Sequence, residues 1–282
     1  MNKVFTVLFL VVLAITTIFT VCADPTTEVC VAKYASDGSL LNETTVSYQW
    51  METNLPIYGD GIFHYYHQGP VFEGDKWDIN ETSNFKDKGA VMGSNVKDLC
   101  DLAGGMSPGD EVMILSEDGY HLEFDYQNVY HPHPRQGPLI ICWYCGEGIE
   151  GFGEVQGVGY PPDYAVGMRL VFFADNSSNS EGKHVFGNWD MYQCLPEKCH
   201  HFYDLYPSTN GFSAKWVDEI RIYEDGYSGQ EGIPVKSLLD SEKSSTSGQR
   251  SDKTPGFEPV MVFVSLALMS YVLRKKDHGQ QK

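Results

Sequence analysis

The chain has 282 residues, and its 20 basic and 38 acidic side chains give a formal net charge of −18. A surface this acidic repels nucleic acid and anionic lipid headgroups, which excludes both as partners of the folded part. Aromatic residues make up 13% of the chain, which excludes general disorder. The roughly 200 residues from Asp24 to about Gly226 are enough for one sizeable core.

The N-terminus has the pattern of a secretory signal peptide. Lys3 precedes an apolar stretch over residues 4–21, and Val21, Cys22 and Ala23 provide the small residues that a signal peptidase prefers. An uncleaved N-terminal anchor has a similar pattern, because about 18 apolar residues are also near the length of a membrane span. We expect cleavage after Ala23, so that residues 1–23 form a signal peptide.

Three Asn-X-Ser/Thr triplets predict N-glycosylation of an exported chain. They begin at Asn42, Asn80 and Asn176. Triplets of this kind also occur by chance. Their combination with an export signal favours a glycosylated domain at the cell surface.

The first half of the folded part predicts a strand, a loop-rich section and a helix. Residues 28–34 are expected to form the strand, and the loop-rich section continues to Lys88. Residues 95–104 predict the helix, because Asn95 can cap its N-terminus and Gly104 can end it. The helix has one apolar face, made of Val96, Leu99, Cys100 and Ala103.

The second half predicts strands separated by turns. They are expected over residues 111–115, 121–124, 139–144, 168–173 and 215–223. The first two flank Asp118-Gly119, a hairpin signal, and the next two are apolar enough to be buried. Long helical periodicity is absent, so the predicted fold class is α+β, dominated by strands and with few short helices.

Six cysteines remain after removal of the signal peptide. They are Cys30, Cys100, Cys142, Cys145, Cys194 and Cys199. An even number in an exported chain favours disulfides, and buried thiols are the second interpretation. The spacing of Cys142 and Cys145, and His200 next to Cys199, leave a tetrahedral metal site as the third. The connectivity cannot be deduced from the sequence.

A histidine-rich segment is a candidate transition-metal site. His64 and His67 are three residues apart and can both bind one ion if they share a turn. The alternative is a polar, hydrogen-bonded surface. Aromatic residues of this part of the chain suit either core packing or stacking against a sugar. They are Tyr48, Trp50, Phe63, Tyr65, Tyr66, Phe72 and Trp77.

The C-terminal residues resemble the PGF-CTERM sorting tail of archaeal surface proteins. A polar stretch over residues 227–253 precedes Pro255-Gly256-Phe257, an apolar run over residues 259–273 and the basic Arg274-Lys275-Lys276. In such proteins an archaeosortase recognises the tripeptide, and the new C-terminus is attached to a lipid. The resemblance implies a sorting tail over residues 254–282 and a secreted protein anchored at the outer face of the cell membrane, through a lipid or through the C-terminal segment.

Five motifs between residues 91 and 226 resemble, in order, the molybdopterin-binding domain of the sulfite oxidase family. They are Gly93-Ser-Asn-Val-Lys-Asp-Leu99, Asp118-Gly119-Tyr120, Pro138-Leu-Ile-Ile-Cys-Trp-Tyr144, Gly167-Met-Arg-Leu-Val-Phe-Phe173 and Lys215-Trp-Val-Asp-Glu-Ile-Arg-Ile222. Each match is weak alone, but the order and spacing are specific for the fold. The resemblance implies a core of that fold over residues 91–226, preceded by a loop-rich part over residues 24–90.

The departures from that family concern its cofactor. In the family a cysteine thiolate upstream of the short helix binds molybdenum, and basic side chains hold the pterin phosphate. Here no cysteine lies between Cys30 and Cys100, and the region has more carboxylates than lysines. We therefore expect that the fold is kept and molybdopterin is not bound.

Two functions follow from these patterns. The first is a non-catalytic binding or structural module without a cofactor, whose partner is a surface-layer glycan or protein. The alternative is an extracytoplasmic oxidoreductase or metal-binding protein, which uses His64, His67 or the Cys/His groups for a transition metal. The sequence does not identify the ligand.

Overall fold

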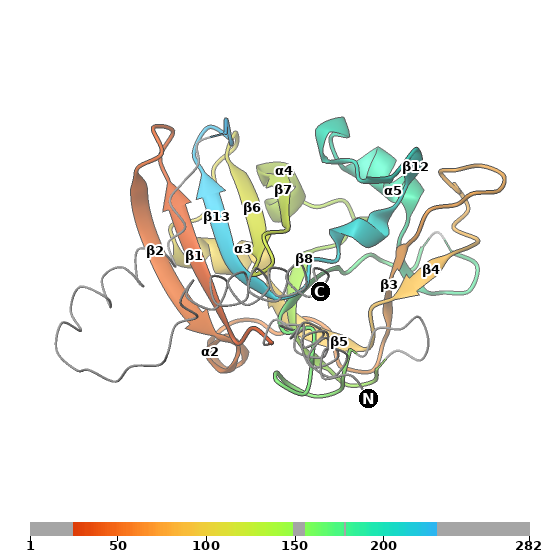
Figure 1. Ribbon diagram of the computed structural model, residues 1–282, viewed down its shortest axis with the longest axis horizontal. Coiled ribbons are helices and arrows are strands. Elements are labelled where there is room, and N and C mark those ends of the chain that lie inside the picture. The colour runs from red at the N-terminus through yellow and green to blue at the C-terminus, as the bar shows by residue number, and fades with distance from the viewer. Residues whose placement is uncertain (1–24, 149–155, 178, 230–282) are drawn as a thin grey trace, which may run out of the picture. The chain divides into compact units, whose positions relative to one another are not determined.

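The computed structural model describes residues 25–148, 156–177 and 179–229 (Figure 1). The chain divides into two compact units, Met1–Val235 and Lys236–Lys282, and all the described residues belong to the first. The predicted signal peptide, the sorting tail and all but three residues of the polar linker lie outside the described residues, so they stay predictions. Among the described residues, no helix has the length and apolar character that crossing a membrane requires.

A five-stranded sheet joins the beginning and the end of the described chain (Figure 1). Its strand order is β2-β1-β13-β6-β7. The bounds in that order are Leu40–Ser47, Glu28–Tyr34, Val217–Tyr223, Glu111–Ser116 and His121–Asp125. β1 and β13 run parallel, and the other neighbours are antiparallel. The last strand therefore occupies the centre of the sheet, between the first strand and the β6–β7 hairpin.

The hairpin of β6 and β7 forms where the sequence predicts it. Gly119 has a φ of +87°, which glycine adopts without strain, and its N–H donates to the Ser116 carbonyl. Ile114 of β6 and Phe124 of β7 are completely buried in the main core. Alternate side chains of each strand point to one face, and in both strands that face is turned to the core. β1 also has the predicted bounds, and β13 begins two residues later than expected.

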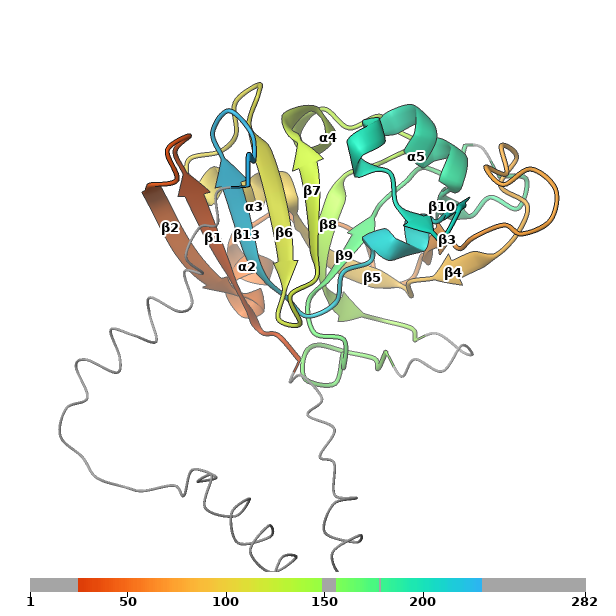
Figure 2. The ribbon, with the colours of Figure 1, turned by 45° about the horizontal axis from the view of Figure 1, so that its top comes forward.

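Two three-stranded sheets and a two-stranded ribbon complete the fold. The order β5-β8-β9 comprises Val91–Asn95, Leu139–Cys145 and Arg169–Phe172. The order β10-β3-β4 comprises His184–Phe186, Tyr65–Gln68 and Phe85–Asp87. The ribbon pairs β11, Phe202–Tyr203, with β12, Tyr206–Pro207. In Figure 2 these elements lie beyond β7, on the side away from β1 and β2. The two predicted buried strands correspond to β8 and β9.

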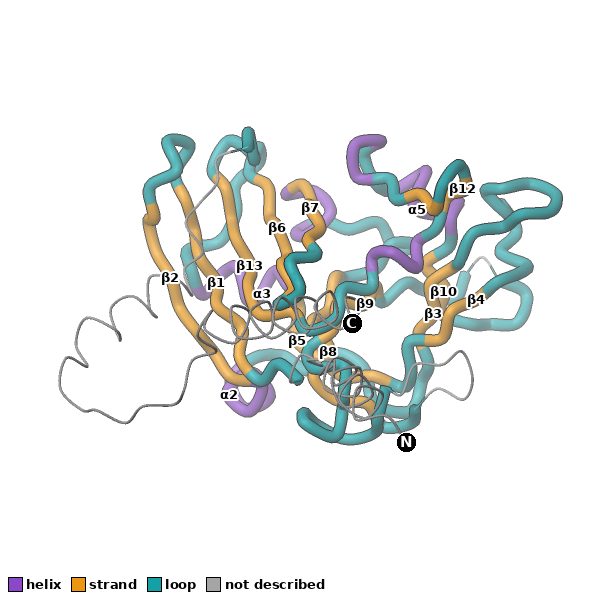
Figure 3. Tube along the Cα trace, in the orientation of Figure 1, coloured by secondary structure: helices purple, strands orange, loops and turns teal. Residues whose placement is uncertain are grey.

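The predicted helix is α3, Val96–Leu102. The Asn95 side chain accepts a hydrogen bond from the Lys97 N–H at 3.0 Å, which satisfies a free donor of the first turn. Gly104 follows with a φ of +105° and ends the helix. The other helical elements are α2 (Tyr48–Asn54), α4 (Tyr126–Tyr130), α5 (Asn188–Cys194) and the 3₁₀ turns η1 (Glu197–Cys199) and η2 (Thr209–Phe212). Figure 3 shows that these helices are short and that strands dominate, which confirms the α+β class.

The loop-rich section expected up to residue 88 contains more regular structure than its pattern indicates. β2, α2, β3 and β4 all lie within it. β2 has little apolar alternation, because it is an edge strand whose first four residues are exposed. β1 and β2 share their sheet with β13 and β6, so the predicted parts 24–90 and 91–226 form one structural unit.

The main core is formed by side chains from the five-stranded sheet, the β5-β8-β9 sheet and α3. An aromatic stack lies at its end towards β10. The Phe172 and Phe186 rings are stacked, with centroids 4.3 Å apart, and Phe124 and Phe212 pack against Phe172 at 5.6 and 5.4 Å. These rings join β7, β9, β10 and η2 across large distances in sequence.

Candidate functional site

The histidine-rich segment forms β3, and its side chains are bonded to protein atoms. His67 is completely buried. Its Nδ1 donates to the Thr209 carbonyl at 3.0 Å, and its Nε2 accepts from the Phe172 N–H at 3.3 Å. Burial, and then the charges of Lys88 and Arg169, hold the pKa of His67 well below its usual range. The ring is therefore neutral, and both of its nitrogens are engaged.

His64 faces the other way, because residues three apart in an extended chain point to opposite sides. Its Nδ1 donates to the Asp87 carboxylate at 2.9 Å, and its Nε2 lies 3.7 Å from Glu147 Oε2. The predicted pairing of His64 with His67 at one metal ion is corrected, since the two rings do not face one ligand. Among the described residues, no group of three or more His, Cys, Asp or Glu side chains is placed to hold a metal ion.

All six cysteines predicted as disulfide candidates are free thiols in the structure. Cys142 and Cys145 both face the second core cluster, because the β5–β8 register shifts between Met92 and Gly93. Burial raises the pKa of every one of these thiols. The structure therefore has buried thiols at Cys100, Cys142 and Cys145, and the disulfides of the exported protein stay a prediction.

The thiols are not placed to hold a molybdopterin cofactor. Cys100 is completely buried on the inner face of α3, where burial holds the pKa of its thiol far above the usual range. Cys30, the upstream thiol of the described residues, is half-buried, and Glu219 and Glu43 add to the effect of burial in raising its pKa. In the family that the chain resembles, the molybdenum ligand is a thiolate, and the absence of molybdopterin from this chain stays a prediction.

The side chains of Lys88 and Arg169 lie in the interior. Lys88 Nζ donates to Asn210 Oδ1 at 2.6 Å, and Arg169 donates to Ser213 Oγ at 2.5 Å and to Gln156 Oε1 at 3.0 Å. Each cation is only 3% exposed, so a phosphate at the surface does not reach them. They bind the η2 segment to β4 and β9. The sequence contains no signal for this burial, because the partners come from distant segments.

A buried polar network fastens β3 to α5 and η2. The Gln68 N–H donates to Thr209 Oγ1 at 2.7 Å, and the Asn188 N–H donates to Gln68 Oε1 at 2.9 Å. The Thr209 N–H donates to Asn188 Oδ1 at 3.0 Å. All three residues are completely buried, where a polar group without a partner is strongly unfavourable. The polar surface expected around β3 is therefore an interior network.

Arg135 joins three carboxylates at the edge of this network. Its guanidinium donates to Glu81 Oε1 at 2.6 Å, to Asp190 Oδ2 at 2.8 Å and to Asp175 Oδ1 at 2.7 Å. Burial, followed by the hydrogen bond and charge of Glu81, raises the pKa of Asp190 to about 8. The protonated form of Asp190 is therefore favoured near neutral pH.

Aromatic rings gather on the surface at α5 and the β11–β12 ribbon, which lie beside each other in Figure 1. The exposed fraction is 61% for Phe72, 51% for Tyr192, 43% for Phe202 and 63% for Tyr203. Trp77 lies between two of them, with its ring 5.0 Å from Tyr192 and 6.0 Å from Phe202. We call these five residues the aromatic cluster.

The ribbon divides the aromatic cluster between its two faces. Successive side chains of a strand point opposite ways, so Phe202 contacts Trp77 while Tyr203 contacts Phe72, at 6.5 Å. Leu205, at the turn of the ribbon, is 74% exposed. The cluster thus joins the segment of Phe72 and Trp77 with α5 and the ribbon, which lie more than 110 residues further along the chain.

The aromatic residues noted in the sequence have different roles. Phe72 and Trp77 belong to the aromatic cluster, whereas Tyr65 stacks on Phe173 at 3.7 Å and Tyr48 on Tyr160 at 5.7 Å. Tyr66 lies 6.3 Å from the His64 ring, and Phe63 is 61% exposed. Core packing therefore accounts for some of these rings, and stacking of the exposed ones against a sugar stays a prediction. The sequence missed the contribution of α5 and the ribbon, because no local pattern links them to Phe72.

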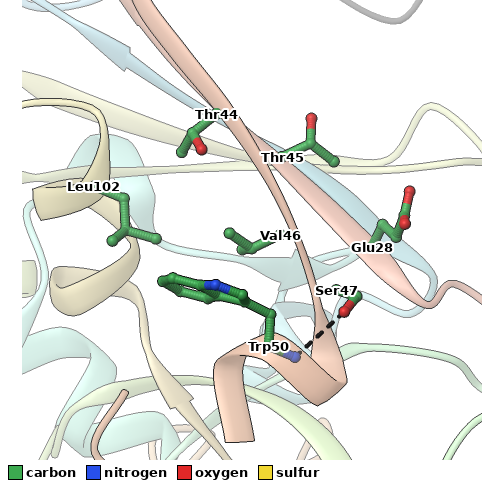
Figure 4. A pocket seen from close by; sticks show the side chains of 7 residues that line it. All are labelled: Glu28, Thr44, Thr45, Val46, Ser47, Trp50 and Leu102. Atoms are coloured by element: carbon green, nitrogen blue, oxygen red, sulfur yellow. Dashed lines mark hydrogen bonds between the residues drawn. The ribbon is translucent and has the colours of Figure 1, made fainter. Parts of the chain in front are cut away.

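A pocket of about 450 Å³ lies at the outer edge of the five-stranded sheet (Figure 4). Figure 4 shows Val46 of β2, Trp50 of α2 and Leu102 of α3 facing one another as an apolar floor. The pocket is also lined by polar side chains, namely Glu28, Thr44, Thr45 and Ser47. Its volume is within the range of small-ligand sites, which bury a ligand on apolar side chains and orient it with a few polar ones.

The three predicted glycosylation sites are at the surface. Asn42 lies in β2, Asn80 in the loop after Trp77 and Asn176 after β9, and all three side chains are exposed. Their modification stays a prediction. No protein-family model matches the chain, and no curated protein matches it.

Proposed function

We propose that the chain is the ectodomain of an archaeal surface protein that binds a neutral glycan through the aromatic cluster and has no catalytic role. The observation that carries this proposal is the exposure of four rings of the cluster, between 43% and 63%. Exposed apolar patches on a folded protein mark interaction surfaces. The polar residues of the histidine-rich segment, by contrast, are bonded inside the protein.

The chemistry of the cluster favours a glycan. Aromatic rings present flat faces that carry partial negative charge, and these faces suit the C–H groups of a sugar ring. The ligand is neutral because the acidic chain, with a net charge of −18, repels polyanions. A surface-layer protein is the competing partner, and the binding experiment below distinguishes the two.

Export and anchoring are part of the proposal. The signal-peptide pattern, the exposed Asn42, Asn80 and Asn176 and the Pro255-Gly256-Phe257 tail support secretion, glycosylation and processing by an archaeosortase. The order of motifs supports a sulfite-oxidase-like fold, and the buried Cys100 supports loss of the molybdenum thiolate.

The alternative function is an extracytoplasmic oxidoreductase or metal-binding protein. It requires a transition metal at His64 and His67 or at the Cys/His groups. The ring nitrogens of His64 and His67 contact protein atoms instead. Elemental analysis of the full chain purified from its own host tests it directly. A stoichiometric transition metal would favour the alternative over the binding module.

The binding proposal is tested with a panel of immobilised neutral polysaccharides, built from hexoses and from N-acetylhexosamines. We expect the full chain to bind at least one of them. The double variant Phe72→Ser, Tyr203→Ser removes two exposed rings, and we expect binding about tenfold weaker, equivalent to about 1.4 kcal/mol.

The matched control is Leu41→Ser, Ile62→Ser, which removes two exposed apolar side chains outside the cluster, with exposed fractions of 52% and 71%. This control should bind as the wild type does. Equal loss in both variants, or no binding to any polysaccharide alongside capture of a surface-layer protein, would contradict the glycan proposal. Circular dichroism confirms that both variants are folded.

A further inference from the structure

The pocket at the sheet edge lies on the same face of β2 as a predicted glycosylation site. The register of β1 and β2 is regular from Asn42 to Ser47, with Asn42 opposite Lys33, Thr44 opposite Val31 and Val46 opposite Val29. Side chains two residues apart in a strand point to the same face. Asn42, Thr44 and Val46 therefore form one row that leads into the pocket.

The exposure of this row increases with distance from the pocket. Val46 is 7% exposed, Thr44 is intermediate and Asn42 is exposed. At about 3.4 Å per residue, Asn42 lies about 7 Å from Thr44 along the strand. Lys33, which is opposite Asn42, donates to the Gly105 carbonyl just after α3. Asn42 therefore lies on the face of β2 that is turned towards α3.

We propose that the glycan on Asn42 folds back along β2 and occupies the pocket, with its sugars against the Trp50 ring. The inference rests on the proposed export of the chain but not on the ligand of the aromatic cluster. Trp50 is 39% exposed and supplies an aromatic face, while the Thr44 hydroxyl, in the same row as Asn42, offers a hydrogen-bond partner to sugar hydroxyls.

The same arrangement gives the glycan a protective role at the edge of the sheet. β2 is an outer strand of its sheet, and Leu40 and Leu41 are 42% and 52% exposed. An exposed apolar edge strand pairs readily with another chain unless charges, proline or a cover prevent it. β2 has one charged residue, Glu43, and no proline. A bulky, solubilising glycan on this strand serves as the cover.

The experiment uses the full chain produced in an archaeal host that N-glycosylates its exported proteins. Mass spectrometry of glycopeptides first establishes which asparagines are occupied. Hydroxyl-radical footprinting then measures the oxidation rate of the Trp50 ring in the wild type and in Asn42→Gln. We expect Asn42 to be occupied and Trp50 to be oxidised severalfold more slowly in the wild type. The Trp77 ring is the internal reference.

Matched controls separate this inference from general effects of glycosylation. Asn80→Gln and Asn176→Gln should leave the Trp50 rate unchanged. Trp50→Ser keeps the glycosylation triplet but removes the aromatic floor. We expect the glycan on Asn42 to raise the Tm of the chain, so that Asn42→Gln lowers it. In the Trp50→Ser variant, adding Asn42→Gln should leave Tm unchanged, because the two substitutions act on one contact.

The outcomes are distinguishable. Equal Trp50 rates in the wild type and Asn42→Gln, with Asn42 occupied, overturn the inference, as does an unmodified Asn42 beside a modified Asn80. If none of the three asparagines is modified in the exported chain, the inference fails while the proposed export stands. Self-association of Asn42→Gln in sedimentation, absent from the wild type, supports the covering of the β2 edge.

Discussion

The five-stranded sheet and the region around α5 are held together in different ways. In the sheet, backbone ladders and buried aliphatic side chains such as Ile114 and Ile220 supply the contacts. Around α5, buried polar side chains do so, as Arg135 does with Glu81 and Asp190. Loss of an aliphatic group leaves a cavity, whereas loss of one polar partner leaves the others buried and unsatisfied. The α5 region is therefore the more sensitive to single substitutions.

The largest expected effect follows from removal of the Arg135 charge. Arg135→Met leaves Glu81 and Asp190 without their cation, and breaking a buried ion pair in this way is destabilising by about 3–5 kcal/mol. Chemical denaturation measures the free energy of unfolding. Hydrogen exchange should show loss of protection in β10 and α5 before the five-stranded sheet opens.

Ile220→Val is the matched substitution in the sheet, where Ile220 is completely buried. We expect it to lower the free energy of unfolding by about 1 kcal/mol and to leave the exchange pattern unchanged. If Arg135→Met were no more harmful than Ile220→Val, the proposed difference between the two regions would be wrong.

The second prediction concerns pH. The pKa of Asp190 is raised from 3.8 to about 8 in the folded chain, so the folded state holds a proton that the unfolded state releases between these values. The contribution of Asp190 to the free energy of unfolding is fully present below pH 3.8 and is lost as the pH rises towards 8. The free energy of unfolding should fall by up to about 1.4 kcal/mol per pH unit in this window. Denaturation midpoints measured across this window test the slope.

The control for the pH prediction is Asp190→Asn, which cannot titrate. Its stability should depend less on pH between 4 and 8 than that of the wild type. Glu123→Gln in β7, a half-buried position outside the network, should retain the wild-type slope. An unchanged slope in Asp190→Asn would show that Asp190 does not hold the proton.

The smallest expected effect lies in the region that the sequence predicts well. Asn95→Ala removes the side chain that caps α3 and should lower the free energy of unfolding by about 1 kcal/mol. Thermal denaturation measures this loss. Asn95→Ser keeps a capping oxygen and should recover most of it, so equal damage by Ala and Ser would argue against a capping role.

The sequence predicted the elements whose pattern is local. The cap at Asn95, the turn at Gly119 and the apolar run of β8 each depend on residues within one element, and all three formed as expected. β2 was missed because its side chains are mostly exposed, and β3 because its polar residues resemble a loop. The buried Gln68 side chain accepts a hydrogen bond from Asn188, which lies 120 positions away, so no local pattern indicates its burial.

The candidate sites show the same limit. The spacing of His64 and His67 suggested a metal site, but the direction of each ring depends on strand geometry and on partners such as Thr209 and Asp87. The aromatic cluster joins Phe72 and Trp77 with α5 and the ribbon, more than 110 residues further on, so no single window of the sequence contains it. Of the row from Asn42 to Val46, the sequence showed only the glycosylation triplet. Neither the strand nor its neighbour Leu102 was predicted.

The central position of β13 sets the order in which the domain is assembled. A chain that emerges from its N-terminus can pair β1 with β2 and β6 with β7 early, because each pair is close in sequence. Until residue 223 has emerged, β1 and β6 each keep an open edge that attracts other strands. The sheet is therefore completed late, when β13 pairs with β1 across about 190 residues of chain. A nascent chain stopped before residue 217 has two hairpins, and the β13-facing edges of β1 and β6 lack their backbone partner.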